Sequence, residues 1–110
     1  MGVLTTTIGA YPKPDYLDLP DWWRDSREGE YYTFNYVDDY EAAIIRLGEE
    51  LEPLCVRATK DAIDDQINAG IDIVTDGEMR RENYIHYHCR ELDGIDFANR
   101  KEMEFRPGYH

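Results

Sequence analysis

Two short apolar runs, far apart in the chain, are each followed by turn-forming residues. Residues 4–8 are β-prone and lead into residues 9–14, where a glycine permits unusual backbone angles and two prolines prevent continued strand pairing. Residues 71–75 form a β-branched run that ends in Asp76-Gly77-Glu78. Each run predicts a short strand that enters a loop.

Helical spacing of apolar residues marks the segments between these runs. Asp38 or Asp39 can cap a helix that extends to about Leu51. Pro53 suits the first turn of a second helix, which continues to about Asn68 and has its apolar residues at positions 54, 58, 62, 63 and 67. Gly70 is the expected C-terminal stop of this helix.

The order strand, helices, strand is typical of a βα unit that contributes to a parallel sheet. A further helix is expected from about Arg80 to Leu92, before the Asp93-Gly94 turn, and one more short strand between residues 95 and 105. These elements indicate the α/β class and one domain over residues 1–110.

Residues 15–39 lack a clean strand or helix period, and only one short helix is expected there, near residues 20–25. This segment holds two aromatic pairs, Trp22-Trp23 and Tyr31-Tyr32. Contiguous aromatic side chains are seldom left in water, so they either form a partner surface or cover the chain's own core.

Composition narrows the functions that fit the chain. The 110 residues include 24 acidic and 12 basic side chains, for a formal net charge of -12. This charge repels phosphate backbones, which argues against nucleic acid as a partner. The sequence has no long apolar run and no basic leader, so we expect no membrane span and a cytoplasmic location. Cys55 and Cys89 are expected to remain reduced.

The two strand-ending loops are the first candidate for a functional site. Loops at the carboxyl ends of parallel strands converge on one face of the sheet, where ligands bind. Ile8-Gly9-Ala10-Tyr11-Pro12 would bring backbone groups close to a ligand, and Asp76-Gly77-Glu78 would direct a carboxylate toward the same space. The alternative is that both loops are ordinary turns.

The His86-x-His88-Cys89 segment resembles a metal cluster. Positions i and i+2 of a helix point about 200° apart, so the two histidines would diverge and packing is the favoured role. Arg80 and Arg81 follow Glu78 and either bind an anionic group or begin a solvated helix.

Two blocks of the sequence together resemble the cobalamin-independent methionine synthase family: Thr5-Thr6-Thr7-Ile8-Gly9-Ala10-Tyr11-Pro12, and Asp65-Gln66-x-x-Ala69-Gly70-Ile71-Asp72-Ile73-Val74-Thr75-Asp76-Gly77-Glu78-x-x-Arg81. The resemblance implies a (βα)8 TIM barrel that transfers a methyl group from a folate, or another alkyl group, to a thiol held as thiolate on zinc. A complete barrel of this type takes about 250 residues. The chain would therefore be a partial TIM barrel with roughly the first two to three βα units.

The resemblance also assigns roles to individual residues. Ile8, Gly9 and Ala10 match the segment that lines the pocket for the amino-acid end of homocysteine, and Glu78 matches the acid that contacts the substrate amine. Ala10 stands where the family usually has serine, and Asn83, also in the substrate-binding set, stands where methionine synthases often have aspartate. The thiol is therefore homocysteine or another small thiol.

The family's zinc ligands come from later strands, so the resemblance implies zinc in the complete enzyme but no ligand in this chain. A complementary chain or a homo-oligomer would complete the assembly, and the isolated chain is expected to be inactive. The leading hypothesis is a small subunit or N-terminal part of a methionine-synthase-like transferase, with no catalytic residue of its own. The alternatives are a non-catalytic binding or regulatory module and an inactive fragment.

Overall fold

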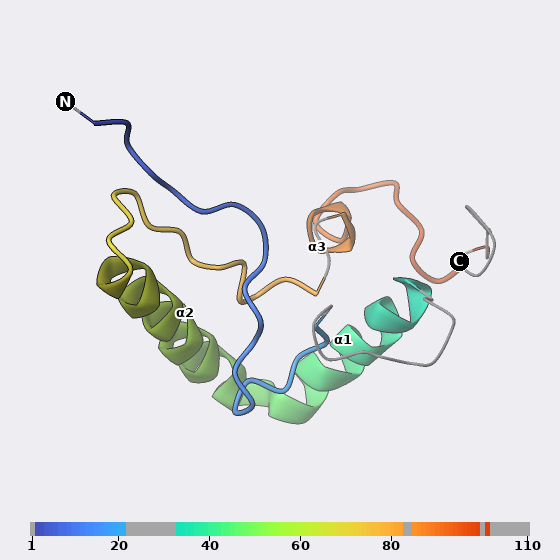
Figure 1. The fold of residues 1–110 in the computed structure, drawn as a ribbon. Helices are drawn as coiled ribbons and strands as arrows, with labels where there is room; N and C mark the ends of the chain where they lie inside the picture. Colours follow the sequence, from blue (N-terminus) through green and yellow to red (C-terminus); the bar gives the residue numbers. More distant parts are fainter. Residues whose placement is uncertain (1, 22–32, 83–84, 100, 102–110) are drawn as a thin grey trace, which may run out of the picture. The chain divides into compact units, whose positions relative to one another are not determined.

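The computed structural model describes residues 2–21, 33–82, 85–99 and 101 (Figure 1). Its helical elements are α1 (Thr33–Leu47), the 3-10 turn η1 (Gly48–Glu50), α2 (Leu51–Asn68) and the short α3 (His86–Cys89). The chain divides into two compact units. The first unit contains Met1–Asp18 and Leu47–Arg81, and the second contains Leu19–Arg46 and Glu82–His110.

Helix α2 confirms the expectation for the second helix, although it begins two residues earlier, at Leu51. Its buried residues recur every three or four positions, which gives one inward face: Cys55, Ala58, Ala62 and Gln66. Pro53 lies in the first turn, where its missing N–H costs no hydrogen bond. Gly70 ends the helix with φ +81°, and the next amide, that of Ile71, donates to the Gln66 carbonyl at 3.0 Å.

Helix α1 differs from its expected bounds at both ends. It begins at Thr33, so Asp38 and Asp39 lie inside the helix and do not cap it. It stops at Leu47 because Gly48 adopts a φ of +53°. The described inward residues of α1 are Val37, Tyr40 and Ala43, whereas Ile45 is exposed.

The two expected strands are much shorter than predicted. Thr6 and Ile73 form an isolated parallel bridge, in which the Ile73 amide donates to the Thr5 carbonyl at 2.9 Å. Figure 1 shows the blue N-terminal segment beside the yellow segment that follows α2. The parallel direction is as expected, but the described residues have no longer ladder. The partial TIM barrel stays a prediction.

Beside this bridge, side chains form hydrogen bonds with backbone groups. The Asp72 carboxylate accepts from the Thr5 amide at 2.8 Å and from the Thr5 hydroxyl at 3.0 Å, and the Thr6 hydroxyl donates to the Ile73 carbonyl at 2.7 Å. Threonine and aspartate side chains compete with regular pairing in this way. The pair of segments is therefore held in register largely by side chains.

The expected helix over residues 80–92 is wrong in extent, because among the described residues of this range only His86–Cys89 is helical. Residues 77–80 form a turn, with positive φ angles at Gly77 (+66°) and Glu78 (+55°). Two successive residues in this conformation cannot begin a helix. Gly94, with φ +87°, fits the expected turn after Asp93.

Several expectations fall outside the described residues. These are the aromatic pairs at Trp22-Trp23 and Tyr31-Tyr32, most of the helix expected near residues 20–25, and Asn83. The described residues of the C-terminal tail, 95–99 and 101, contain no strand. None of the helices in the described part of the chain is long and apolar enough to cross a membrane.

A polar contact holds the 11–18 segment against α2 in the first unit. Tyr16 donates a short hydrogen bond to the Asp61 carboxylate, and the Arg57 guanidinium lies 3.9 Å from the centre of the Tyr16 ring. Burial raises the pKa of the Tyr16 phenol above its ordinary value, and the hydrogen bond to Asp61 acts in the same direction. Leu17, next in the chain, is fully buried.

A buried ion pair organises the second unit. The Arg90 guanidinium donates to Glu82 at 2.7 Å, and the Glu82 side chain is fully buried. Arg90 also lies 4.6 Å from the centre of the Tyr40 ring of α1 and 3.8 Å from the Glu41 carboxylate. These contacts join the segment that contains α3 to α1.

Candidate functional site

The two loops that the sequence predicts to converge do meet in the first unit. The Tyr11 amide donates to the Gly77 carbonyl at 2.9 Å. A Cβ atom on Gly77 would lie 3.1 Å from the Tyr11 Cβ and 3.3 Å from the Ala62 Cβ, closer than ordinary van der Waals contact. Glycine at position 77 therefore provides both the positive φ and the space for this close approach.

Gln66 forms hydrogen bonds with the same two segments just before the loops, next to the parallel bridge between Thr6 and Ile73. Its carbonyl oxygen accepts from the Thr75 amide and from the Thr7 hydroxyl, each at 2.9 Å. Its NH2 group donates to the Thr75 carbonyl at 2.8 Å and to the Ala62 carbonyl at 2.9 Å. The Gln66 side-chain amide thus satisfies the backbone N–H and C=O groups of Thr75, as a neighbouring strand would. Only 1% of Gln66 is exposed.

Ile8, Gly9 and Ala10 form a short loop between these two contacts. On one side Thr7 bonds to Gln66 and lies 3.0 Å from the Thr75 hydroxyl, and on the other side Tyr11 bonds to Gly77. Ile8 is 99% exposed, and Gly9 has a φ of +84°. The loop is therefore fixed at both ends while its middle faces outward.

Glu78 lies in the turn directly after Gly77. Its amide donates to the Asp76 carboxylate at 2.9 Å, which stabilises the turn, and its own carboxylate accepts from Arg81 at 3.1 Å. About a quarter of the Glu78 side chain is exposed (25%). The carboxylate is thus oriented by a cation and still accessible to a ligand.

Two further basic residues contribute to this turn. Lys13 is buried, and its ammonium donates to the Arg81 carbonyl at 2.6 Å. Arg80 pairs with Glu52 of α2 at 2.5 Å. Of the two arginines expected either to bind an anion or to be solvated, Arg81 pairs with the candidate site carboxylate and Arg80 with the helix.

The described residues do not fit a zinc ion. Among residues 2–21, 33–82, 85–99 and 101 there is no group of three His, Cys, Asp or Glu side chains that could hold a metal. The His86 ring packs edge-on against Phe97 at 6.3 Å, and the His88 ring packs edge-on against Tyr87 at 5.4 Å. The two histidines of the apparent cluster therefore have separate aromatic neighbours.

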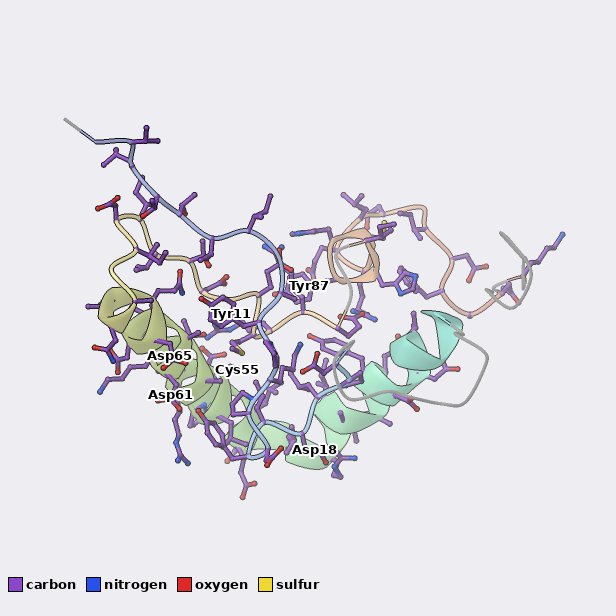
Figure 2. All side chains as sticks on the ribbon, viewed as in Figure 1. Tyr11, Asp18, Cys55, Asp61, Asp65 and Tyr87 are labelled. Carbon is purple, nitrogen blue, oxygen red and sulfur yellow. The ribbon has the colours of Figure 1, made fainter. Side chains whose placement is uncertain are left out.

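Neither thiol forms a disulfide. Cys55 is buried on α2, and burial raises the pKa of its thiol. Cys89 is partly exposed. Figure 2 shows Cys55, Asp61 and Asp65 along α2, and Tyr11 on the N-terminal segment. A buried thiol of raised pKa is a poor nucleophile, so Cys55 acts as a core residue.

Sequence reasoning missed Gln66, Thr7 and Thr75 as residues that shape the site. A signal was present, because Gln66 continues the inward face of α2 at i+4 from Ala62. A polar residue on an apolar helical face requires buried hydrogen-bond partners. The threonines at the ends of the two β-prone runs are such partners.

Helix α2 precedes the second of two parallel segments, and the glycine-containing loops that follow these segments meet. Residues 3–106 match the family model described as cobalamin-independent synthase, catalytic domain. The chain therefore belongs to this family, as its sequence motifs predict.

Individual relatives agree with the family match. The chain is 30% identical over 95 residues to a 5-methyltetrahydropteroyltriglutamate–homocysteine methyltransferase of Shewanella oneidensis, which covers 86% of this chain and 10% of that protein. It is 32% identical over 93 residues to a methionine synthase of Sulfolobus acidocaldarius, a match that covers 84% of this chain and 22% of that protein. A methionine synthase of Saccharolobus islandicus is 30% identical over 93 residues, with 84% and 23% covered.

The chain thus spans between 10% and 23% of the length of these relatives. No solved structure matches the chain.

Proposed function

We propose that the chain is the N-terminal part, or a small subunit, of a thiol methyl- or alkyltransferase, and that it binds the amino-acid end of the thiol substrate. One observation carries the proposal: the outward-facing loop of residues 8–10 and the turn that holds Glu78 are joined by the hydrogen bond from Tyr11 to Gly77. The family match and the names of the relatives support the same reaction class.

The groups at the site suit an amino acid. An ammonium group is best bound by a carboxylate, and the accessible Glu78 side chain provides one. A carboxylate needs N–H donors, which the backbone of Ile8 and Gly9 would provide beside Ala10, in the absence of the family's serine hydroxyl. Arg81 orients the Glu78 carboxylate when no ligand is present. Homocysteine is the first substrate to test.

Exposed apolar side chains in the first unit support a complementary chain as partner. Val3 is 92% exposed, Leu4 71% and Ile73 53%, and all three lie in or beside the bridged segments. Exposed apolar edges of this kind attract further strands. We propose that a chain carrying the rest of a (βα)8 barrel covers this edge, with a homo-oligomer as the alternative.

The complementary chain would also hold the zinc ion that the family implies, because the described residues of this chain offer no ligand set. Zinc would supply an acidified thiol. This chain would orient the other end of the thiol substrate, and the alkyl donor is a folate or another alkyl compound.

The first experiment is to purify the chain from its own host and to determine native mass, zinc content and co-eluting proteins. A complex with a larger, zinc-containing chain supports the proposal. A zinc-free monomer or homo-oligomer refutes the catalytic assignment.

The second experiment tests Glu78 within that complex. Glu78→Gln removes the charge that would pair with the substrate ammonium, so the KM for homocysteine should rise by about tenfold or more. Glu52→Gln is the matched control, since Glu52 is an exposed carboxylate on α2 that pairs with Arg80. Equal KM values for the Glu78 variant and the unmodified complex would refute the role of Glu78.

A non-catalytic binding or regulatory module is the second candidate, and Ala10 favours it. Its methyl group offers no hydroxyl to a ligand carboxylate, which weakens the polar character of the site. This candidate predicts a native complex that contains no zinc.

A further inference from the structure

We infer that Gln66 is a positioning residue that sets the spacing between the 8–10 loop and the Glu78 turn. This inference rests on the proposed function, because the loops matter only if they bind substrate. Gln66 belongs to α2 and is almost fully buried, with no surface from which to contact a ligand. Its effect would be transmitted entirely through its hydrogen bonds.

The hydrogen bonds of Gln66 lie immediately before both loops. Thr7, which donates to the Gln66 side-chain carbonyl, directly precedes Ile8. Thr75, whose amide and carbonyl both bond to Gln66, directly precedes the Asp76-Gly77-Glu78 turn. A shift of Gln66 would therefore reach both halves of the candidate site within three residues.

The far side of the site is closed by a contact that does not involve Gln66. The Tyr11 amide and the Gly77 carbonyl rejoin the two segments at 2.9 Å. At the start of the 8–10 loop, the distance between the two segments is set by the Gln66 side-chain amide. At the end of the loop, it is set by a backbone hydrogen bond. Because the backbone contact is common to all the variants below, changes at position 66 isolate the first spacing.

The geometry requires both a donor and an acceptor at position 66. The carbonyl oxygen serves Thr7 and the Thr75 amide, and the NH2 group serves the Thr75 and Ala62 carbonyls. Methionine fills a similar volume but removes all four of these hydrogen bonds. Glutamate keeps the acceptors but directs a carboxylate oxygen at two carbonyls.

The test uses the assembled complex with homocysteine as the probe. For Gln66→Met we expect the KM for homocysteine to rise about tenfold, while kcat at saturation changes by less than about threefold. Thr7→Val removes one hydroxyl without changing the side-chain shape and should also raise the KM, whereas Thr7→Ser keeps the hydroxyl and should restore it. Thr59→Val is the control, because Thr59 lies on the same helix and its buried hydroxyl has no hydrogen-bond partner among the described residues.

The outcomes separate the two proposals. If the unmodified complex neither binds nor alkylates homocysteine, the proposed substrate is wrong and the role of Gln66 falls with it. If the unmodified complex is active and Gln66→Met keeps its KM, Gln66 has no positioning role and the proposed function stands. If Gln66→Met does not assemble, Thr7→Val decides: an unchanged KM, or a rise that Thr7→Ser does not reverse, overturns the inference.

Discussion

Replacement of Gly77 by alanine tests the close approach of the two loops directly. Gly77 has a φ of +66°, and an alanine in this region costs about 1–2 kcal/mol of backbone strain. The added Cβ would also lie 3.1 Å from the Tyr11 Cβ, 3.2 Å from its Cγ and 3.3 Å from the Ala62 Cβ. Two of these three atoms are Cβ atoms fixed to the backbone, so relief requires movement of the segments themselves.

Overpacking of this kind typically adds about 1–3 kcal/mol. Gly77→Ala should therefore reduce the free energy of unfolding by about 2–5 kcal/mol. Gly70→Ala is the matched control in the same unit, because Gly70 has φ +81° and an added Cβ there would meet nothing within 4 Å. It should lose only the strain contribution, about 1–2 kcal/mol.

The assay is urea unfolding of the full chain, monitored by circular dichroism. Sucrose is added to all samples so that a destabilised variant still populates the folded state. The difference between the two alanine variants isolates the steric contribution at Gly77. Equal losses for Gly77→Ala and Gly70→Ala would show that the loops do not approach as closely as the contact between Tyr11 and Gly77 requires, and the reasoning would be refuted.

Three further predictions concern residues outside the candidate site. Arg90→Leu should destabilise the chain by about 3–5 kcal/mol, because it leaves the fully buried Glu82 carboxylate without its cation; a loss below about 1 kcal/mol in urea unfolding would contradict this. In the folded chain Cys55 should react with a thiol reagent more slowly than Cys89, and equal rates by mass spectrometry would contradict its burial. Since the pKa of Tyr16 is raised in the folded chain, its contribution to stability is complete below about pH 10 and decreases as the pH rises through the folded value. Tyr16→Phe should reduce this loss of stability at alkaline pH, measured by unfolding at a series of pH values. An identical loss in the variant would contradict the prediction.

The sequence predicts the local elements best where one residue type decides the outcome. Gly70 ends α2 because glycine adopts a positive φ at low cost, and this stop is correct. The predicted start of α1 is wrong. Aspartate is a favourable capping residue, which suggested a start at Asp38 or Asp39, whereas the helix begins upstream at Thr33. A favourable capping residue does not exclude helix on its N-terminal side.

The site is predicted in part for a related reason. Chain order and glycine spacing predict that the two loops meet, and they do. The length of the strands is not predicted, because β-propensity does not reveal that Asp72 and Gln66 side chains will occupy backbone groups that a longer ladder would use. The Gln66 hydrogen bonds that limit the strands also hold the residues that directly precede the two loops.

The described hydrogen bonds at the two ends of the 8–10 loop lie within the first unit. Thr7, Gln66 and Thr75 hold one end and Tyr11 and Gly77 the other, and no contact at either end uses the side chain of residue 10. Alanine at position 10, where the resemblance implies serine, therefore removes a hydroxyl without altering any of these hydrogen bonds. If the assembled protein rejects homocysteine, the missing hydroxyl at Ala10 is the first departure to test, and the search for its substrate should turn to thiols whose acidic group needs fewer donors.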